Sequence, residues 1–547
     1  MIHAGPAIGF PTFATLPTVG YGLNDLTVTM LLGAFALFLA VVSVRISDRS
    51  GVPVMLLYLG IGLLFGSDGM GIRFDDAGLT QVLGYAALVL ILADGGLTTS
   101  WPGIRRSVAP ALALSTVGVV VSIVVVAAGA RFIFGWSWQL SLLLGAILAS
   151  TDAAAVFSVL RNVALPRRVR GMLEAESGFN DAPVVIITTA LALQLTTGAE
   201  ETSWLELLAL ALLELTAGAV IGLLIGWIAG RLVRQIASGT SGLFAIAVLA
   251  IPILAYAAAS AAHTSGFIAA YLGALVLGNM DLPHVNAVHA FASAVGTLAQ
   301  IGLFFLLGLL ASPIRLSSQV VPALVLGFVL LVVARPLSVA VSLAPFRIPW
   351  RDQIFLSWAG LRGAVPVVLA TVPVTLGAAG TTWIFDFVFV LVLIYTLVQG
   401  PTLPWLAERL GLVESVQPVP LSVETTVLDR MNAEIVTAQI GPRSKLHGVE
   451  VFELRLPRDA NITLVVRNGH TFVPDGVSRL RHGDEILIVT PAPLRHEVEK
   501  RLVMVSRYGR LAGWVVESPP RLGRRARARR RAGQLWRRAQ AAARPRS

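Results

Sequence analysis

The chain has 547 residues, of which 55% are hydrophobic and only 13% are charged. A soluble globular protein carries about 25% charged residues, so we expect most of this chain to lie in a membrane. The net charge of +11 arises in residues 521–547, which hold 11 arginines and no acidic residue, and the rest of the chain is neutral overall. This distribution argues against a nucleic-acid-binding protein and predicts a tail attracted to anionic lipid headgroups. The absence of cysteine excludes disulfides and thiolate chemistry.

The apolar part of the chain predicts an all-α polytopic membrane domain over residues 25–405. A spanning helix needs about 20 mostly apolar residues. Thirteen segments meet or approach this requirement, namely 25–45, 50–67, 80–99, 107–130, 138–160, 171–197, 204–230, 242–261, 264–278, 287–311, 318–342, 352–372 and 382–404. Residues 1–24 have no basic residue before an apolar stretch, so we expect an extracytoplasmic segment rather than a cleaved secretory signal.

The loops between these segments predict the orientation of the chain. Alternate loops contain 12 arginines, whereas the opposite loops contain only Arg73, Arg131 and Arg315. The positive-inside rule places the arginine-rich loops in the cytoplasm. We therefore expect a multi-pass protein of a bacterial plasma membrane, with its N-terminus outside and its C-terminus in the cytoplasm.

The composition changes after residue 405 and predicts a small α+β domain. Residues 406–430 are interpreted as a linker. Residues 431–503 have the alternating pattern of strands at 433–440, 462–467 and 485–489, followed by a helical pattern at 494–502. A domain of this size buries little core alone, so dimerisation would stabilise it. Residues 504–547 are assigned to the basic tail, which we expect to be disordered.

Ionisable residues inside the predicted spans give the first indication of function. A charge within a span is costly, and it usually faces a bundle interior or an aqueous path. At ~1.5 Å per residue, Asp181 and Arg362 lie about 15 Å from the cytoplasmic ends of their spans, and Asp152 lies about 21 Å from the outer end of its span. Three charges from three spans therefore converge near one depth. The other charged residues within spans are Asp94, Glu174, Glu176, Glu214, Arg335 and Asp386.

Two of these spans contain helix-breaking residues at the depth of the charges. One reads Gly360-Leu361-Arg362-Gly363-Ala364-Val365-Pro366, and the other reads Ser150-Thr151-Asp152. The two spans are seven apart in chain order and so run in opposite directions, as in the inverted repeats of secondary transporters. The charges of Asp152 and Arg362 could neutralise the dipoles of the opened half-helices. The alternative for each is a static buried ion pair.

The sixth span supplies groups suited to ion exchange. Ser177 and Asp181 are four residues apart and share one helix face, and Thr151 lies across the gap. Their oxygens are hard ligands for a monovalent cation. Burial favours the protonated form of a carboxylate, whereas a bound cation favours its ionised form, so a proton and a cation compete for one aspartate.

These motifs resemble the bacterial monovalent cation:proton antiporter superfamily, close to its NhaP-like branch. The resemblance covers residues 25–405 and rests on Glu-Ser-Gly-Phe-Asn-Asp at 176–181, Thr-Asp at 151–152 and Gly-Leu-Arg-Gly at 360–363. It implies a homodimer of 13-helix subunits, in each of which a core domain moves against a dimerisation domain. It also implies an antiporter that exchanges potassium or sodium for protons, without a cofactor and without enzymatic activity.

The resemblance also assigns roles to individual residues. Asp181 is expected to exchange the proton for the cation, with Thr151, Asp152 and Ser177 helping to bind the ion. Asn180 is counted with them among the proton- or cation-binding residues, and its presence in place of a second aspartate implies electroneutral exchange. A buried ion pair is implied between Glu176 and Arg362. Asp94, where similar proteins often have glutamate, and Arg335 are accessory candidates.

The C-terminal residues 432–502 resemble the TrkA-C subdomain of regulators of potassium conductance. The Gly-x-Gly-x-x-Gly turn of a nucleotide-binding Rossmann half does not precede them. The resemblance implies a dimerising regulatory domain that binds a small ligand such as a cyclic dinucleotide. It favours potassium as the transported cation and leaves sodium as the alternative.

Other functional classes fit the sequence less well. Residues 18–22 spell the potassium-channel filter Thr-Val-Gly-Tyr-Gly, but a filter needs a spanning helix and a pore helix before it, and only 17 residues precede Thr18. No histidine pair has zinc-ligand spacing, which argues against a zinc enzyme. Glu206 and Glu214 are interpreted as interfacial or helix-packing residues. A membrane sensor is the remaining alternative, and it does not explain three charges at one depth.

Overall fold

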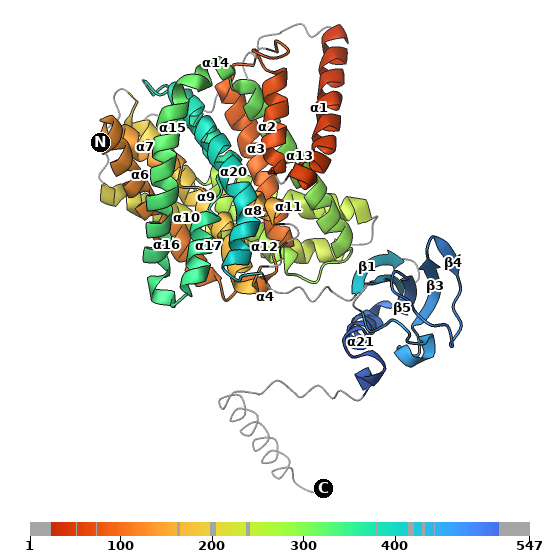
Figure 1. Ribbon diagram of the computed structural model, residues 1–547. Coiled ribbons are helices and arrows are strands. Elements are labelled where there is room, and N and C mark those ends of the chain that lie inside the picture. The colour runs from red at the N-terminus through yellow and green to blue at the C-terminus, as the bar shows by residue number, and fades with distance from the viewer. Residues whose placement is uncertain are drawn as a thin grey trace, which may run out of the picture. The chain divides into compact units, whose positions relative to one another are not determined.

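The computed structural model divides the chain into two compact units at Glu414/Ser415. It describes residues 23–50, 52–72, 74–160, 163, 165–196, 204–236, 241–378, 380–413, 421–428, 433–441 and 444–513. The filter-like motif at residues 18–22 and the arginines of residues 521–547 lie outside these described residues, as do residues 1–22 of the predicted N-terminal segment. Each unit is described separately below (Figure 1).

The first unit is helical. In Figure 1 its short helices α14 and α4 lie at opposite ends of the unit. The helices are α1 Leu23–Ser50, α2 Val54–Phe65, α3 Ala77–Thr98, α4 Trp101–Ile104, α5 Val108–Ala113, α6 Val119–Phe134, α7 Trp138–Ile147, α8 Ala153–Val159, α9 Arg167–Gln194, α10 Trp204–Ile236, α11 Ser241–Ala261, α12 Gly266–Gly278, α13 Val285–Leu310, α14 Pro313–Leu316, α15 Val320–Phe328, α16 Arg335–Leu343, α17 Trp350–Trp358, α18 Ala364–Leu369, α19 Val372–Thr375 and α20 Trp383–Arg409.

Two of the helical stretches contain a π-helical turn. The turn η1 (Leu114–Gly118) joins α5 to α6, and the turn η3 (Val329–Ala334) joins α15 to α16. Short 3-10 turns, η2 (Ser317–Gln319) and η4 (Ala344–Phe346), precede α15 and follow α16. A π turn adds one residue to a helical turn, and such turns are frequent at functional sites.

Helix occupies each of the thirteen predicted spans within the described residues. Eight helical stretches are long and apolar enough to cross a membrane by length and composition, and four shorter apolar helices lie between them. The expected all-α polytopic architecture is therefore confirmed, whereas the number of thirteen spans stays a prediction.

The helices of this unit form two bundles. Helices α1 to α3 pack with α10 to α13, while α5 to α9 pack with α15 to α18 and α20. Between the bundles, α9 contacts α10 and α12, and α18 contacts α3 and α13. Small residues allow close packing, since a Cβ added at Gly226 of α10 would lie 2.7 Å from the carbonyl oxygen of Gly273 of α12. The boundary between the bundles, here called the seam, positions the site described below.

The second unit is a five-stranded antiparallel sheet packed on one helix. The strand order is β1-β2-β5-β3-β4. Alternate residues of the central strands, such as Val436, Ala438 and Ile488, are buried against Val498 and Leu502 of the helix. The elements are β1 Leu421–Leu428, β2 Ala433–Ile440, β3 Asn461–Arg467, β4 His470–Phe472, β5 Glu485–Pro491 and α21 Arg495–Tyr508, with 3-10 turns η5 Val451–Leu454, η6 Ala492–Leu494 and η7 Gly509–Gly513.

Two predicted boundaries in this region are wrong. The predicted linker at 406–430 contains the end of α20, which continues to Arg409, and strand β1, which pairs with β2. The predicted tail at 504–547 begins too early, because α21 continues to Tyr508 and the turn η7 follows it. In both places a regular element extends past the predicted boundary because it packs on a neighbour: β1 pairs with β2, and α21 packs on the sheet.

A charged pair holds the turn before β5 against β3. Asp484 is fully buried, and Arg467 donates to its two carboxylate oxygens from Nε at 2.8 Å and from Nη2 at 2.7 Å. The backbone N–H of Arg481 donates to the same carboxylate at 2.7 Å. Hydrogen bonding to Asp484 raises the pKa of the Arg467 guanidinium above its ordinary value. A bidentate pair of this kind fixes both orientation and register.

We predict that Arg467→Ala destabilises the sheet, because it leaves the Asp484 carboxylate buried without its bidentate partner. A loss of about 2 kcal/mol is expected, which corresponds to a roughly 30-fold faster exchange of the strand amides. Hydrogen–deuterium exchange of the full chain, read on peptides from β2, β3 and β5, measures this. The control is Arg479→Ala, which removes an exposed pair with Glu450. Equal exchange in the two variants would contradict the prediction.

Candidate functional site

Two interrupted helices cross at the centre of the first unit. Helix α7 ends at Ile147 and α8 begins at Ala153, while α17 ends at Trp358 and α18 begins at Ala364. The unwound stretches meet through their backbones, because the N–H of Asp152 donates to the carbonyl oxygen of Leu361 at 2.9 Å. A Cβ at Gly363 would overlap the Asp152 carboxylate, so glycine is required at this crossing. Both breaks predicted from the sequence are present.

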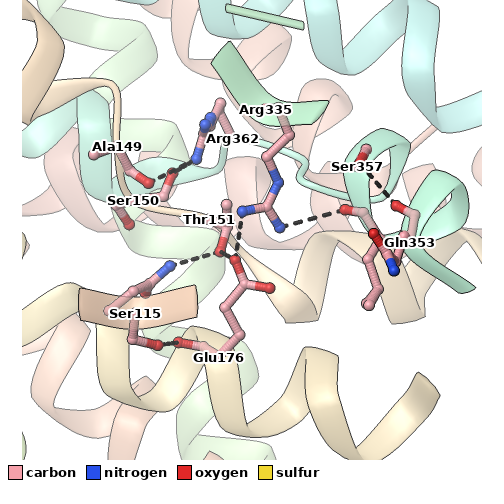
Figure 2. Close-up of polar contacts among 11 residues, drawn as sticks. Ser115, Ala149, Ser150, Thr151, Glu176, Arg335, Gln353, Ser357 and Arg362 are labelled. Carbon is pink, nitrogen blue, oxygen red and sulfur yellow. Dashed lines mark hydrogen bonds and ion pairs between the residues drawn. The ribbon is translucent and has the colours of Figure 1, made fainter. Parts of the chain in front are cut away.

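Opposite charges lie at the ends of the half-helices. The Oδ1 atom of Asp152 accepts from the N–H of Ala155 at 3.1 Å and caps the N-terminus of α8. Arg362 Nη1 donates to the carbonyl oxygens of Ala149 at 2.8 Å and Ser150 at 2.5 Å, just beyond the end of α7 (Figure 2). Each charge has the sign that the adjacent helix end favours. The predicted neutralisation of the half-helix dipoles agrees with these contacts.

Asp181 is buried on α9 beside the first break. Its carboxylate accepts from the hydroxyl of Ser150 at 2.7 Å. Two residues later, Pro183 lies inside α9 and has no backbone N–H to donate to the preceding turn. Sequence reasoning did not assign Ser150 to the site, although its position before Thr151-Asp152 in the unwound stretch is the signal that marks it.

Hydrogen bonds of Thr151 connect the unwound stretch between α7 and α8 to Asn180 and Glu176, which lie on the face of α9 next to that of Asp181. The Nδ2 atom of Asn180 donates to Thr151 Oγ1 at 2.6 Å, and the Thr151 hydroxyl donates to Glu176 Oε1 at 3.4 Å. These side chains form one hydrogen-bonded row from Asn180 to Glu176. The row fixes the orientation of the unwound stretch relative to α9.

The structure corrects the expected partner of Glu176. Its Oε1 lies 2.7 Å from Nη1 of Arg335, and both side chains are at least 95% buried. Arg335 also donates to the carbonyl oxygen of Leu356 at 3.3 Å (Figure 2). The predicted pair of Glu176 with Arg362 is wrong as a direct contact, because the guanidinium of Arg362 binds the carbonyls that follow α7. Arg335, an accessory candidate in the sequence, is the ion-pair partner.

A cavity of about 330 Å³ opens beside these residues along the seam. Asp181 lines it together with the other predicted cation ligands Thr151, Asp152 and Ser177. Asp94 of α3 lines the same cavity from the other bundle, and its Oδ1 accepts from Ser293 Oγ of α13 at 2.8 Å. Carboxylate and hydroxyl oxygens from both bundles therefore surround one space, which is the arrangement that a small hard cation requires.

Three further charged candidates have other surroundings. Glu174 lines the cavity and forms a pair with Arg170 one turn away, at 2.8 Å. Asp386, near the start of α20, lies 3.5 Å from Arg315 and does not line this cavity. Glu214 lines a different cavity, beside the other half of α9.

The geometry agrees with what comparisons with known proteins show. Residues 34–409 match the family described as sodium/hydrogen exchanger, transmembrane, and residues 435–503 match the TrkA-C domain. A protein named K(+)/H(+) antiporter NhaP2 from Shewanella baltica is 35% identical over 471 residues, which cover 85% of this chain and 81% of that protein. A protein named K(+)/H(+) antiporter NhaP from Alkalimonas amylolytica is 35% identical over 476 residues, with 85% and 82% covered.

A solved structure shares the fold. The sodium proton antiporter MjNhaP1 from Methanocaldococcus jannaschii at pH 8 superposes with a TM-score of 0.61 at 21% identity, covering 70% of this chain and 99% of that chain. The family match spans well over half of the chain and includes every residue of the crossing and the cavity. The resemblance seen in the sequence motifs is confirmed: the chain belongs to the sodium/hydrogen exchanger family and has a TrkA-C domain after its transmembrane part.

Proposed function

We propose that this protein is a secondary active antiporter that exchanges a monovalent cation for protons across a bacterial plasma membrane. The observation that carries the proposal is the buried carboxylate of Asp181 in an oxygen-lined cavity at the crossing of two interrupted helices. Potassium is the favoured cation, because the relatives that are 35% identical are named potassium/proton antiporters. Sodium is the alternative, which the family description supports.

The environment of Asp181 supports competition between the two ions. Within the described residues no arginine forms an ion pair with Asp181, because Arg335 contacts Glu176 and Arg362 contacts backbone carbonyls. A buried ionised carboxylate without a cationic partner is costly. Either a proton or a cation bound at Asp181 removes that cost. In this mechanism Thr151, Asp152 and Ser177 contribute oxygens to the cation, and Asn180 contributes no second charge, which favours one-for-one electroneutral exchange.

The cavity reaches toward the arginine-rich end of α9. Its lining includes Arg170 near the start of the helix and Asp181 near the middle, which are about 16 Å apart at the helical rise. The arginine-rich loops are cytoplasmic under the positive-inside rule, with the N-terminus outside and the C-terminus inside. On this orientation, Asp181 faces an inward-directed cavity in the present state.

The C-terminal unit fits a regulatory role. Its TrkA-C match covers residues 435–503, which include most of β2, all of β3, β4 and β5, and most of α21. We propose that the antiporter is a homodimer and that this domain regulates exchange, with a small ligand such as a cyclic dinucleotide as its effector. The residues of the crossing, Asp152, Leu361, Arg362 and Gly363, all belong to the transmembrane unit.

We predict that Asp181→Asn abolishes cation-driven proton movement, because an amide cannot exchange a proton for a cation at this site. The measurement is fluorescence dequenching in everted vesicles with a preset pH gradient and added potassium, sodium or lithium. Asp386→Asn, which changes a buried carboxylate outside the cavity, is the control and should retain exchange. Exchange by Asp181→Asn with an unchanged apparent affinity would refute the proposed role, and the order of the three cations measures selectivity.

We predict that Glu176 and Arg335 are energetically coupled, whereas Glu176 and Arg362 are not coupled through a direct pair. Arg335→Met leaves a buried carboxylate without its partner, at a cost of about 3–5 kcal/mol. The double variant Glu176→Gln with Arg335→Met removes both charges and should melt at a higher temperature in detergent than Arg335→Met alone. The matched control is the same comparison with Arg362→Met in place of Arg335→Met, alone and combined with Glu176→Gln. A rescue by Glu176→Gln that appears only with Arg362→Met would show that the assigned pair is wrong.

We predict that deletion of residues 415–547 preserves exchange and shifts its dependence on cytoplasmic pH, because the transmembrane unit ends at Glu414. The pH profile of potassium-driven exchange in everted vesicles, normalised to protein amount, measures this. A truncated protein that inserts and remains monodisperse but does not exchange would show that the C-terminal unit is required for transport itself.

A further inference from the structure

A second cavity, of about 300 Å³, lies beside the other half of α9. The side chains that α9 contributes to it include Val185, Thr189 and Leu193, and those it contributes to the first cavity include Ser177 and Asp181. At 3.6 residues per turn these positions form one continuous stripe. The two cavities therefore follow each other along the same face of α9, with the second at the end farther from Arg170.

Two helices of the other bundle also contribute to both cavities. Helix α3 presents Tyr85 to the second cavity and Asp94 to the first, and α12 presents Phe267 to the second and Tyr271 to the first. The ring of Phe267 packs edge-on between Tyr85 and Tyr256, with both centroid distances 5.3 Å. This aromatic trio lines the second cavity and does not line the first, although the two cavities share the same three helices.

The second cavity contains its own carboxylate and hydroxyl groups. Glu214 of α10 lines it, and its polar neighbours there are Thr189, Tyr256, Ser260, Thr264 and Ser265. The backbone carbonyl of Glu214 accepts from the N–H of Ser265 at 3.2 Å, which places this turn of α10 beside the first residue of the short helix α12. The positive end of α12 favours an ionised carboxylate at this position.

Helix packing alone does not account for the position of Glu214. A carboxylate within a membrane segment is costly unless it serves an aqueous path or a partner. A helix-packing role of Glu214, as predicted from the sequence, explains its position near the N-terminal end of α12. It does not explain why the Glu214 carboxylate borders a cavity with several hydroxyl groups. Hard oxygen donors around a negative charge are the chemistry that an alkali cation prefers.

We propose that the second cavity is a waiting site for the alkali cation on the outer side of the membrane, with Glu214 attracting the ion. This inference rests on the proposed antiport function and on the orientation given by the arginine-rich loops. In the present state Asp181 lines the first cavity and not the waiting site. Movement of one bundle along the seam would bring the Asp181 stripe of α9 to the second cavity, because both cavities already lie on that stripe.

The test compares the two sides of the membrane in proteoliposomes that contain the full chain in a known orientation. We expect Glu214→Gln to raise the apparent KM for potassium added from the outer side about tenfold at low ionic strength, with a smaller effect at high ionic strength. The KM for potassium added from the cytoplasmic side should not change. A structural role of Glu214 would alter both sides alike.

Two variants provide matched controls. Glu206→Gln removes a carboxylate two to three turns earlier on the same helix, at an exposed position that does not line the cavity, and should behave as wild type. Glu214→Asp keeps the charge and should retain most of the outer affinity. If Glu214→Gln yields no folded protein, Ser260→Ala decides the question, since a raised outer KM supports the proposal and an unchanged one overturns it.

Two results with Glu214→Gln would overturn the waiting site. One is an unchanged outer KM, and the other is an equal rise on both sides. Normal exchange by wild type and Glu206→Gln in the same experiment would leave the antiport function intact. Absence of exchange in wild type would instead contradict the antiport function itself, so the two failures are distinguishable.

Discussion

The constraint on which this transmembrane unit depends is the need to satisfy backbone polar groups where two helices stop inside the protein. Each interruption leaves N–H and carbonyl groups without helical partners, and lipid offers none. The chain solves this by crossing the two unwound stretches, so that Asp152 donates its backbone N–H to Leu361 and Arg362 donates to Ala149 and Ser150. The crossing is thus held by the groups that the breaks expose. The proposed ion site lies at the same place, where hydroxyl and carboxylate groups gather beside the open backbone.

The two π turns contribute to the same solution from the neighbouring helices. Ser115 of η1 donates to the backbone carbonyl of Glu176 at 3.0 Å, and Arg335, the first residue after η3, pairs with the Glu176 carboxylate. The helical stretches that contain η1 and η3 directly precede the two interrupted helices in the chain. Both therefore direct a polar side chain at one glutamate. The pseudo-symmetry expected of inverted repeats thus extends from the breaks to the helices that support them.

Sequence reasoning located the depth of the site better than its pairing. The rise per residue gave Asp152, Asp181 and Arg362 a common layer, and all three lie at the crossing. Depth does not give the direction in which a side chain points, so it could not decide whether Arg335 or Arg362 contacts Glu176. The π turn η3 alters the rotation of the helix at Arg335, and nothing in the apolar residues of that turn signals it.

The same limit explains the other differences between prediction and structure. Ser177 lies four residues before Asp181 in the sequence, whereas Ser150 lies 31 residues before it, and only the path of the unwound stretch shows that Ser150 donates to the Asp181 carboxylate. Strand β1 has alternating valine and polar residues, but its regularity comes from pairing with β2 rather than from a strong local pattern. The local sequence therefore predicted the helices and strands and the depth of the charged residues, whereas contacts between residues far apart in the chain determined which side chains and strands pair.

The distribution of positive charge explains why the proposed exchange is assigned to Asp181 rather than to Glu176. Glu176 is also buried, but the ion pair with Arg335 neutralises its charge. The Thr151 hydroxyl also donates to the Glu176 carboxylate. Asp181 has a neutral hydroxyl partner instead, so a mobile ion must compensate its charge. Gly178 lies between these two acidic positions on α9 and leaves room for the ring of Tyr271, since a Cβ there would overlap that ring. The contact between the bundles at Gly178 and Tyr271 is therefore close and uncharged, so the bundle movement proposed above would break no ion pair at this contact.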